Sequence, residues 1–169
     1  MLLRQETAAD YEAVYKLITE AFATAEHTDG NEQDLVVALR KSDAFVPELS
    51  IVAEIDGELA GHILFTTAKV GGDEALVLAP LAVKPKHQRQ GVGSALIAKG
   101  HEIAAELGYQ YSLVLGSETY YPRAGYIPAV QLGVEVPEGF PSNNFMAIKL
   151  EENAKPICGS VIYPKEFGL

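Results

Sequence analysis

The chain has 169 residues, of which 48% are hydrophobic and 21% charged, and its formal net charge is −10. This length fits one domain with a full core, and no apolar stretch is long enough to span a membrane. The single cysteine, Cys158, excludes a disulfide framework and argues against a Cys-rich zinc site. The acidic balance argues against a general nucleic-acid-binding protein, because binding to phosphates needs a basic face. The first residues lack a signal-peptide pattern, so we expect a cytoplasmic protein without a metal.

The N-terminal part is predicted to be a short strand followed by two helices. Residues 2–4 are an apolar start for an edge strand. Thr7 has the position of a helix N-cap, with Asp10 three places later in the capping-box position, and apolar residues at helical spacing continue to about Ala23. After a polar loop, a second helix is predicted over residues 32–41.

The middle of the chain is predicted to be three antiparallel strands in sequence. Residues 50–55 form the first strand, and Asp56-Gly57 is the two-residue turn typical of a hairpin. The return strand covers residues 58–70. A Gly-Gly turn then leads into a third strand over residues 75–83.

A helix and a strand follow, and then an irregular C-terminal part. Val92, Leu96, Gly100, Ile103 and Leu107 form one apolar helical stripe, and Gly108 is the expected stop. An apolar strand covers residues 111–115, and a right-handed crossover would place it parallel to the strand that ends at residue 83. A short helical or turn segment is predicted over residues 116–125 and a long loop or irregular strand over 130–144. A strand is expected over 145–150, and a small one within 159–163 of the tail.

The most informative segment is the run from Leu81 to Leu96, which reads as a strand, a basic loop and a helix start. Gly91 and Gly93 lack a Cβ, so the backbone can approach a ligand closely there. The free N–H groups of a first helical turn bind phosphate well. Positive charge gathers around this point from Lys84, Lys86, His87 and Arg89. The run therefore predicts an anion site, suited to a phosphorylated cofactor.

Two familiar phosphate loops do not fit this run. A Walker loop ends in Gly-Lys-Ser/Thr, whereas Ser94 follows Gly93 directly. A dinucleotide fingerprint needs a third small residue where this chain has Leu96.

What remains, Gln88-x-x-Gly91-x-Gly93, resembles the acetyl-CoA pyrophosphate signature Q/R-x-x-G-x-G/A of the GNAT superfamily of N-acetyltransferases. A second segment, Tyr120-Tyr-Pro-Arg-Ala-Gly-Tyr126, resembles the F/Y-Y-x-x-x-G-F/Y element of the fourth helix of that family. The order of predicted elements is also similar over about residues 1–150. Gly61-His62-Ile63 and the tail over 163–167 look like the YhbS-like subgroup.

The resemblance implies an α/β fold with a central, mostly antiparallel sheet, one splayed parallel strand pair and helices on both faces. Residues 1–150 would form a single GNAT domain, and 151–169 an extension packed on it. Acetyl-CoA would lie in the gap of the splayed pair, with its pantetheine arm along the strand and its pyrophosphate on the loop. The residues expected to bind it are Leu81, Ala82, Val83, Gln88, Arg89, Gln90, Gly91, Val92, Gly93 and Ser94.

The implied reaction is direct attack of an amine of a small molecule or peptide on the acetyl thioester. Tyr121 aligns with the family tyrosine four places before the glycine, and a protonated tyrosine can donate to the leaving thiolate. Tyr120 is expected merely to pack against the sheet. The general base stays open between His62, Glu26, His27 and Glu32, a water relay, or an amine that arrives unprotonated, because residues 76–83 contain no carboxylate.

Two other functions stay open at this point. A noncatalytic acyl-CoA-binding or sensory module would keep the glycine loop without needing the Tyr121 hydroxyl. A transferase of a longer acyl group would need a deeper cleft. The segment 130–144 is expected to border the acceptor site, since long Pro- and Gly-rich loops often carry function. The acceptor itself is unidentified, and a homodimer is left open.

Overall fold

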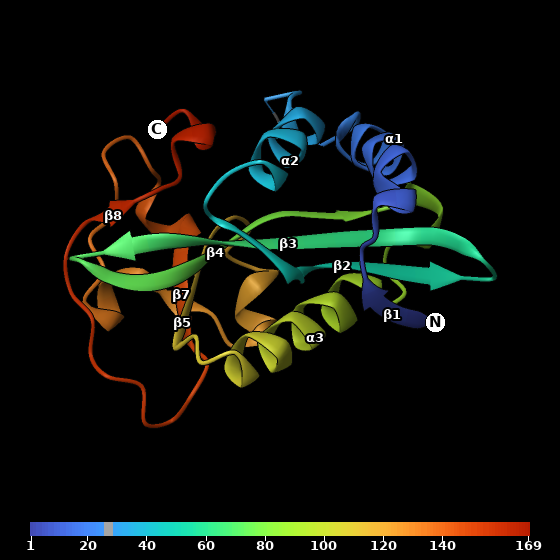
Figure 1. The fold of residues 1–169 in the computed structure, drawn as a ribbon. Helices are drawn as coiled ribbons and strands as arrows, with labels where there is room; N and C mark the ends of the chain where they lie inside the picture. Colours follow the sequence, from blue (N-terminus) through green and yellow to red (C-terminus); the bar gives the residue numbers. More distant parts are fainter. Residues whose placement is uncertain (26–28) are drawn as a thin grey trace.

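The structure is a computed structural model that describes residues 1–25 and 29–169, and its strands form a twisted mixed sheet (Figure 1). The sheet has the order β1-β2-β3-β4-β5-β7-β6, and β8 pairs with β3 outside this path. Only β4 and β5 among the described neighbours run parallel. The strands are β1 (Leu2–Gln5), β2 (Phe45–Ile55), β3 (Glu58–Val70), β4 (Asp73–Val83), β5 (Tyr111–Leu115), β6 (Ile127–Pro128), β7 (Phe145–Lys149) and β8 (Val161–Ile162).

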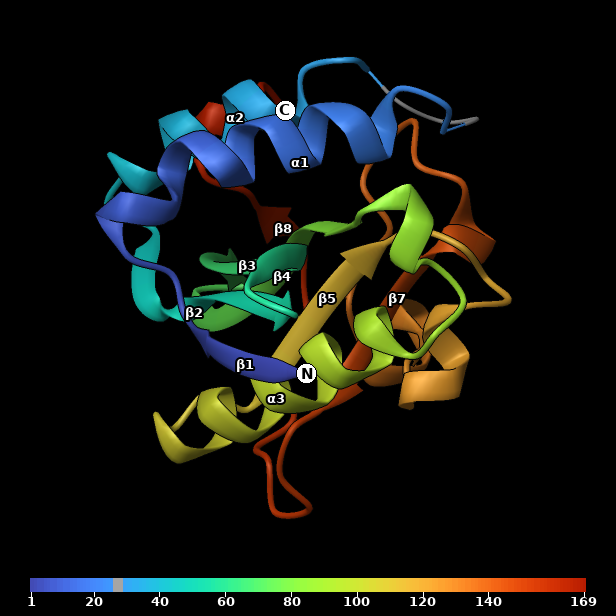
Figure 2. The same ribbon diagram turned by 90° about the vertical axis from the view of Figure 1, so that its right-hand side faces the viewer.

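The helices lie on both faces of this sheet. Helices α1 (Tyr11–Phe22) and α2 (Glu32–Arg40) cover one face, and α3 (Val92–Glu106) lies on the other (Figures 1 and 2). The predicted N-cap is confirmed in a modified form, because a 3₁₀ turn over Ala8–Asp10 precedes α1. The Asp10 carboxylate accepts a hydrogen bond of 2.7 Å from the Thr7 N–H, as the capping box requires.

The three predicted strands in the middle of the chain are confirmed, and β3 has the predicted bounds. Strand β2 begins at Phe45, five residues before the expected start. The pairing with β3 shifts register between Phe45 and Ser50. The exposed Pro47 and Glu48 lie in this irregular stretch and interrupt the apolar pattern, which hid the first part of the strand in the sequence.

Strands β4 and β5 are joined over a very short length, which opens the sheet. Their parallel register covers only the pairs Leu76–Ser112 and Val77–Leu113. Strand β4 has a register shift against β3 beyond Leu78, at the position of Pro80, which has no N–H to donate. The predicted parallel, splayed pair is therefore confirmed.

The backbone of β4 beyond this shift faces the opening. The Lys84 N–H donates to the carbonyl of Ala60 in β3 at 2.8 Å. Because successive residues of a strand direct their polar groups to opposite edges, Leu81 and Val83 direct theirs away from β3. These two residues therefore offer free edge positions on the side where β5 has diverged.

Helix α3 packs against the sheet through small residues. A Cβ added to Gly100 would overlap the ring of Phe65, so the glycine permits the close approach of helix and sheet. The buried stripe consists of Val92, Leu96, Ile97, Gly100 and Ala104. The prediction for Leu107 was wrong, because this residue caps the helix and its side chain is 43% exposed. Gly108 adopts a φ of +93°, which confirms the predicted stop.

The C-terminal part is anchored through apolar contacts. The predicted loop 130–144 contains short 3₁₀ turns, and its buried Val134 bridges to Gly159. Phe140 packs edge-on against Phe145 and Tyr163. Strand β8 confirms the small strand predicted in the tail. The segment 130–144 is thus a structured cover with exposed turns.

Among the described residues, no helix is both long and apolar enough to cross a membrane.

Candidate active site

The loop between β4 and α3 presents a row of free backbone N–H groups. Gly91 is the N-cap of α3 with a φ of +84°, and Arg89 also has a positive φ, of +62°. Within the described chain, no backbone N–H from Arg89 to Ser94 donates to a backbone carbonyl, and the ladder starts at Ala95, which donates to Gly91 at 3.0 Å. The first turn of α3 therefore has the unpaired donors that the sequence predicted for an anion.

The side chains of this loop are arranged differently from the expectation. Gln88 donates from its amide Nε2 to the Val83 carbonyl at 3.1 Å, and its backbone N–H donates to Pro85. Gln88 thus braces the loop against the end of β4. Lys84 and Lys86 both pair with Glu58, which lowers the pKa of that carboxyl. Their charge is partly neutralised there, so the predicted basic cluster is weaker than the composition of the loop implies.

The two glycines of the motif have different surroundings. Nothing lies within 4 Å of the position of a Cβ on Gly91, so this glycine leaves open space, as predicted. The same position on Gly93 is filled by the hydroxyl of Tyr120. Gly93 therefore admits a side chain of this protein to the first turn of α3, which the sequence analysis had assigned to a ligand.

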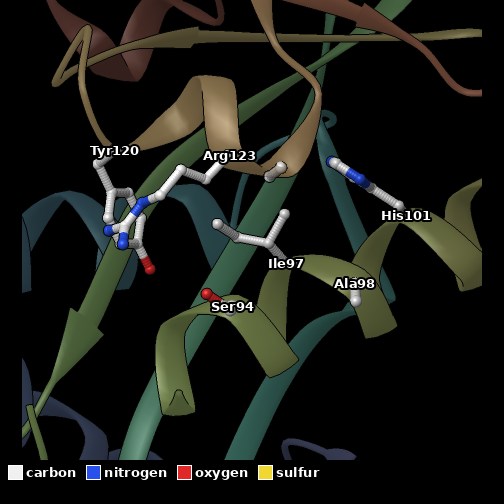
Figure 3. Close-up of a pocket in the computed structure, with 7 residues that line it drawn as sticks. Ser94, Ile97, Ala98, His101, Tyr120 and Arg123 are labelled. Carbon is white, nitrogen blue, oxygen red and sulfur yellow. The ribbon is translucent and has the colours of Figure 1, made fainter. Parts of the chain in front are cut away.

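Tyr120 and Tyr121 precede and begin a short 3₁₀ helix, Tyr121–Ala124, after the carboxyl end of β5. The expectation that Tyr120 merely packs against the sheet was incomplete, because its hydroxyl points toward the start of α3 (Figure 3). The ring of Tyr121 lies against Gly116, one residue beyond β5. It also makes edge-on contacts with the rings of Tyr120 and Tyr126, at centroid distances of 5.2 and 5.8 Å. The two neighbouring hydroxyls thus serve different places.

The Tyr121 hydroxyl is well suited to stay protonated. Burial of the ring raises the pKa of Tyr121 above its usual value, and the nearby Tyr120 adds to this shift. The hydroxyl makes no hydrogen bond to any other described residue. A protonated phenol with a free donor is what a general acid requires.

A pocket of about 220 Å³ lies beside this tyrosine pair, between α3 and the 3₁₀ helix (Figure 3). The guanidinium of Arg123 lies 4.9 Å from the centroid of the Tyr120 ring. At the other end, His101 hydrogen-bonds to the Tyr126 hydroxyl at 2.9 Å, and that hydroxyl bonds to Ser112 at 2.8 Å. Burial lowers the pKa of His101 to about 4, so its ring is neutral at pH 7.

The sequence analysis missed Arg123 and His101 as site residues. A usable signal was present for Arg123, because it lies three residues after Tyr120 and such a spacing on a helical turn places both on one face. His101 has no such signal, since only the tertiary packing of α3 beside Tyr126 gives it a place in the pocket.

The proposed bases differ in what the structure says of them. His62 lies in β3 with 0% exposure, and its Nε2 lies 3.1 Å from the Ser50 hydroxyl and 3.7 Å from Glu6. This burial under α1 and α2 argues against direct contact with an acceptor. Glu32 starts α2 and accepts a hydrogen bond of 3.1 Å from the Asp29 N–H. Glu26 and His27 lie outside the described residues.

In the ranges 1–25 and 29–169, no group of three or more His, Cys, Asp or Glu side chains is arranged to hold a metal. The expected absence of a metal stays a prediction.

Known proteins resemble this chain over most of its length. The chain is 46% identical over 101 residues to the uncharacterized N-acetyltransferase YjhQ of Escherichia coli, a match that spans 57% of this chain and 56% of that relative. It is 26% identical over 170 residues to the uncharacterized N-acetyltransferase YhbS of the same species, covering 99% and 98% of the two chains.

Two solved structures share the fold closely. The crystal structure of YhbS from Escherichia coli in complex with CoA superimposes with a TM-score of 0.89, at 27% identity, over 99% of this chain and 92% of that one. A GNAT acetyltransferase from Brucella melitensis in complex with acetyl-CoA gives a TM-score of 0.82, at 28% identity, over 98% and 97%. The YhbS-like resemblance is thereby confirmed.

The family model described as acetyltransferase (GNAT) family matches residues 11–126, which include both motifs of the sequence analysis. This match confirms the expected enzyme class, an acyltransferase. The chain belongs to the acetyltransferase (GNAT) family.

Proposed function

We propose that this protein transfers an acetyl group from acetyl-CoA to a primary amine of a small molecule or peptide. The observation that carries the proposal is the continuity between the free edge of β4, the unpaired N–H groups at the start of α3, and the Tyr121 hydroxyl near the end of β5. The complexes of YhbS with CoA and of the Brucella melitensis relative with acetyl-CoA support the choice of cofactor.

The cofactor would bind along the opening of the sheet. Its pantetheine arm has amide groups that can pair with Leu81 and Val83 as an added strand would, with Ala82 between them facing β3. Its pyrophosphate would accept hydrogen bonds from the N–H groups of Arg89, Gln90, Gly91, Val92, Gly93 and Ser94, at the positive end of the α3 dipole. The side chain of Gln88 would act indirectly, by bracing the loop.

The chemical step would be direct attack of the amine nitrogen on the thioester carbon. The carbon–sulfur bond breaks, and the departing thiolate takes a proton from Tyr121. The parent thiol has a reference pKa of about 8.5, so proton donation by a phenol assists departure at neutral pH. The amine loses its proton to water or to a base that is still unidentified.

The acceptor would approach between the segments 23–31 and 130–144. Both follow or precede elements that border the open pair of strands, and the second segment presents the exposed acidic residues Glu135 and Glu138. An acidic border favours a cationic amine. Cytoplasmic location, the lack of nucleic-acid binding and a homodimer stay predictions.

The proposal is tested by incubating the protein with acetyl-CoA and a panel of polyamines, lysine peptides and amino sugars. Free thiol is measured over time, and the product mass is determined. We expect thiol release that depends on one class of amine, with a mass gain of one acetyl group. Tight binding of CoA without turnover of any amine would favour the noncatalytic module. Faster turnover with longer acyl-CoAs would favour the other alternative.

A further inference from the structure

The pocket between α3 and the 3₁₀ helix Tyr121–Ala124 has chemistry of its own, beyond the cofactor-binding residues expected from the sequence. We propose that this pocket binds the nucleotide end of CoA, and that Arg123 binds its 3′-phosphate. This inference rests on the proposed function, because it assigns another part of the same cofactor.

The first argument is the state of Arg123. The chain carries a net charge of −10, yet the exposed guanidinium of Arg123 forms no ion pair with any described carboxylate. It is held instead against the ring of Tyr120 at 4.9 Å. A guanidinium stacked on an aromatic ring keeps its N–H fork free, and that fork matches the oxygens of a phosphate.

The second argument is the grouping of donors beside it. The Tyr120 hydroxyl and Ser94 lie at the same end of the pocket as the first turn of α3, and Figure 3 shows Arg123 alongside them. Tyr120 therefore holds a hydroxyl at the first turn of α3 and a cation against its ring. A phosphate at this end of the pocket would meet both without leaving the reach of the α3 N–H groups.

The third argument is the shape of the remaining pocket. Its walls along α3 run from Ser94 to His101, a span of seven residues or about 10 Å at the helical rise. Ile97, Ala98 and Ala124 make this part apolar, and the neutral His101 closes it. A flat, uncharged heterocycle fits such a surface, while the phosphate stays at the charged end.

The proposal predicts that the protein distinguishes CoA from dephospho-CoA, which lacks only the 3′-phosphate. Calorimetry on the unaltered protein should give a Kd for CoA that is lower by about tenfold or more, the scale of a charge-assisted hydrogen bond. Arg123→Gln should remove most of this preference, and Arg123→Lys should keep part of it. Because Arg123 is exposed, the melting temperature should change little.

The matched control is Lys99→Gln, which removes one positive charge from α3 outside the pocket and should leave the preference intact. Equal affinity of the unaltered protein for both cofactors would overturn the assignment, as would a full preference in Arg123→Gln. Binding of neither cofactor would instead refute the proposed function. As a second measurement, adenosine 3′,5′-bisphosphate should displace CoA at a lower concentration than adenosine 5′-phosphate does. Equal competition by the two would also overturn the assignment.

Discussion

At the scale of single residues, Tyr120 and Tyr121 show how one turn of chain can serve two purposes. Their rings meet edge-on at 5.2 Å, but one hydroxyl reaches Gly93 on α3 while the other ring lies against Gly116 beyond β5. Only Tyr121 has its pKa clearly raised by burial. The two hydroxyls can therefore be separated by experiment, one through turnover and the other through cofactor binding.

Replacing Tyr121 with Phe should lower kcat by about 100-fold or more, the usual scale of general acid catalysis. The substitution removes one hydroxyl that bonds to no other described residue, so the fold and the affinity for CoA should persist. Steady-state kinetics and calorimetry measure the two quantities separately. Tyr109→Phe is a suitable control, because Tyr109 is half-buried at the far end of α3. Unchanged kcat in Tyr121→Phe, with the chemical step limiting, would remove Tyr121 from the mechanism.

The glycines show what could be read from the sequence at this scale and what could not. The motif predicted both the positive φ of Gly91 and its open surroundings, since these depend on local backbone geometry. The partner of Gly93 could not be predicted, because Tyr120 is distant in sequence and reaches α3 only through the packing of the 3₁₀ helix. A side chain at position 93 would displace Tyr120 before it touched a ligand.

At the scale of elements, the segment 130–144 is held at fixed points between exposed turns. Val134 and Phe140 are packed, whereas Glu138 and Gly139 lie in an exposed turn closed by a 3.0 Å hydrogen bond from the Phe140 N–H to Pro137. Shortening the segment would remove these anchors and disturb the fold. A change of charge at the turn tests its role without this complication.

Glu138→Lys should raise the KM of a cationic acceptor severalfold and leave the KM of acetyl-CoA unchanged, because the reversed charge repels the amine near its entrance. Initial rates at varied concentrations of each substrate measure the two constants. Glu106→Lys makes the same change in charge on an exposed residue of α3 and should alter neither. A parallel effect of both variants would show a general electrostatic change and would contradict a bordering role for this segment.

Elements with a strong local pattern were predictable, and those shaped by tertiary contacts were not. The bounds of β3 and β5 follow from apolar runs between turn residues. The early start of β2 could not be read, because Pro47 and Glu48 break its alternation while β3 still pairs with Phe45. Likewise, Leu107 fits the helical spacing, but the sheet ends before it.

At the scale of the whole molecule, a buried ionic network joins the N-terminal layer to the sheet. Arg40 of α2 and Glu6 are linked at 2.6 Å with side-chain exposures of 8% and 1%. Ser50 donates to Glu6 at 2.8 Å and also contacts His62. Burial lowers the pKa of His62 to about 4; Glu6 opposes this shift, and Arg40 reinforces it. The folded protein therefore disfavours protonation of this histidine.

The free energy of unfolding should fall as the pH drops from about 6.5 to about 4. In this range the unfolded chain binds a proton at His62 that the folded chain rejects, a loss of up to about 1.4 kcal/mol per pH unit. His101 acts in the same direction, and Asp10, whose pKa is lowered to about 2 chiefly by its hydrogen bond with Arg4, adds a loss only below about pH 4. Urea unfolding at several pH values measures the slope. His62→Gln should flatten it between pH 6.5 and 4.5, and an unchanged slope would contradict the assignment.

The short seam between β4 and β5 has a consequence for the molecule in action. Two residue pairs hold together what are otherwise two separate leaves, β1–β4 and β5–β7. On the proposed function, a bound cofactor supplies the missing rungs of this ladder, so the substrate is for a time a structural member of the protein. Each turnover would then complete the sheet and undo it again, and the resting enzyme would be the less rigid partner in that cycle.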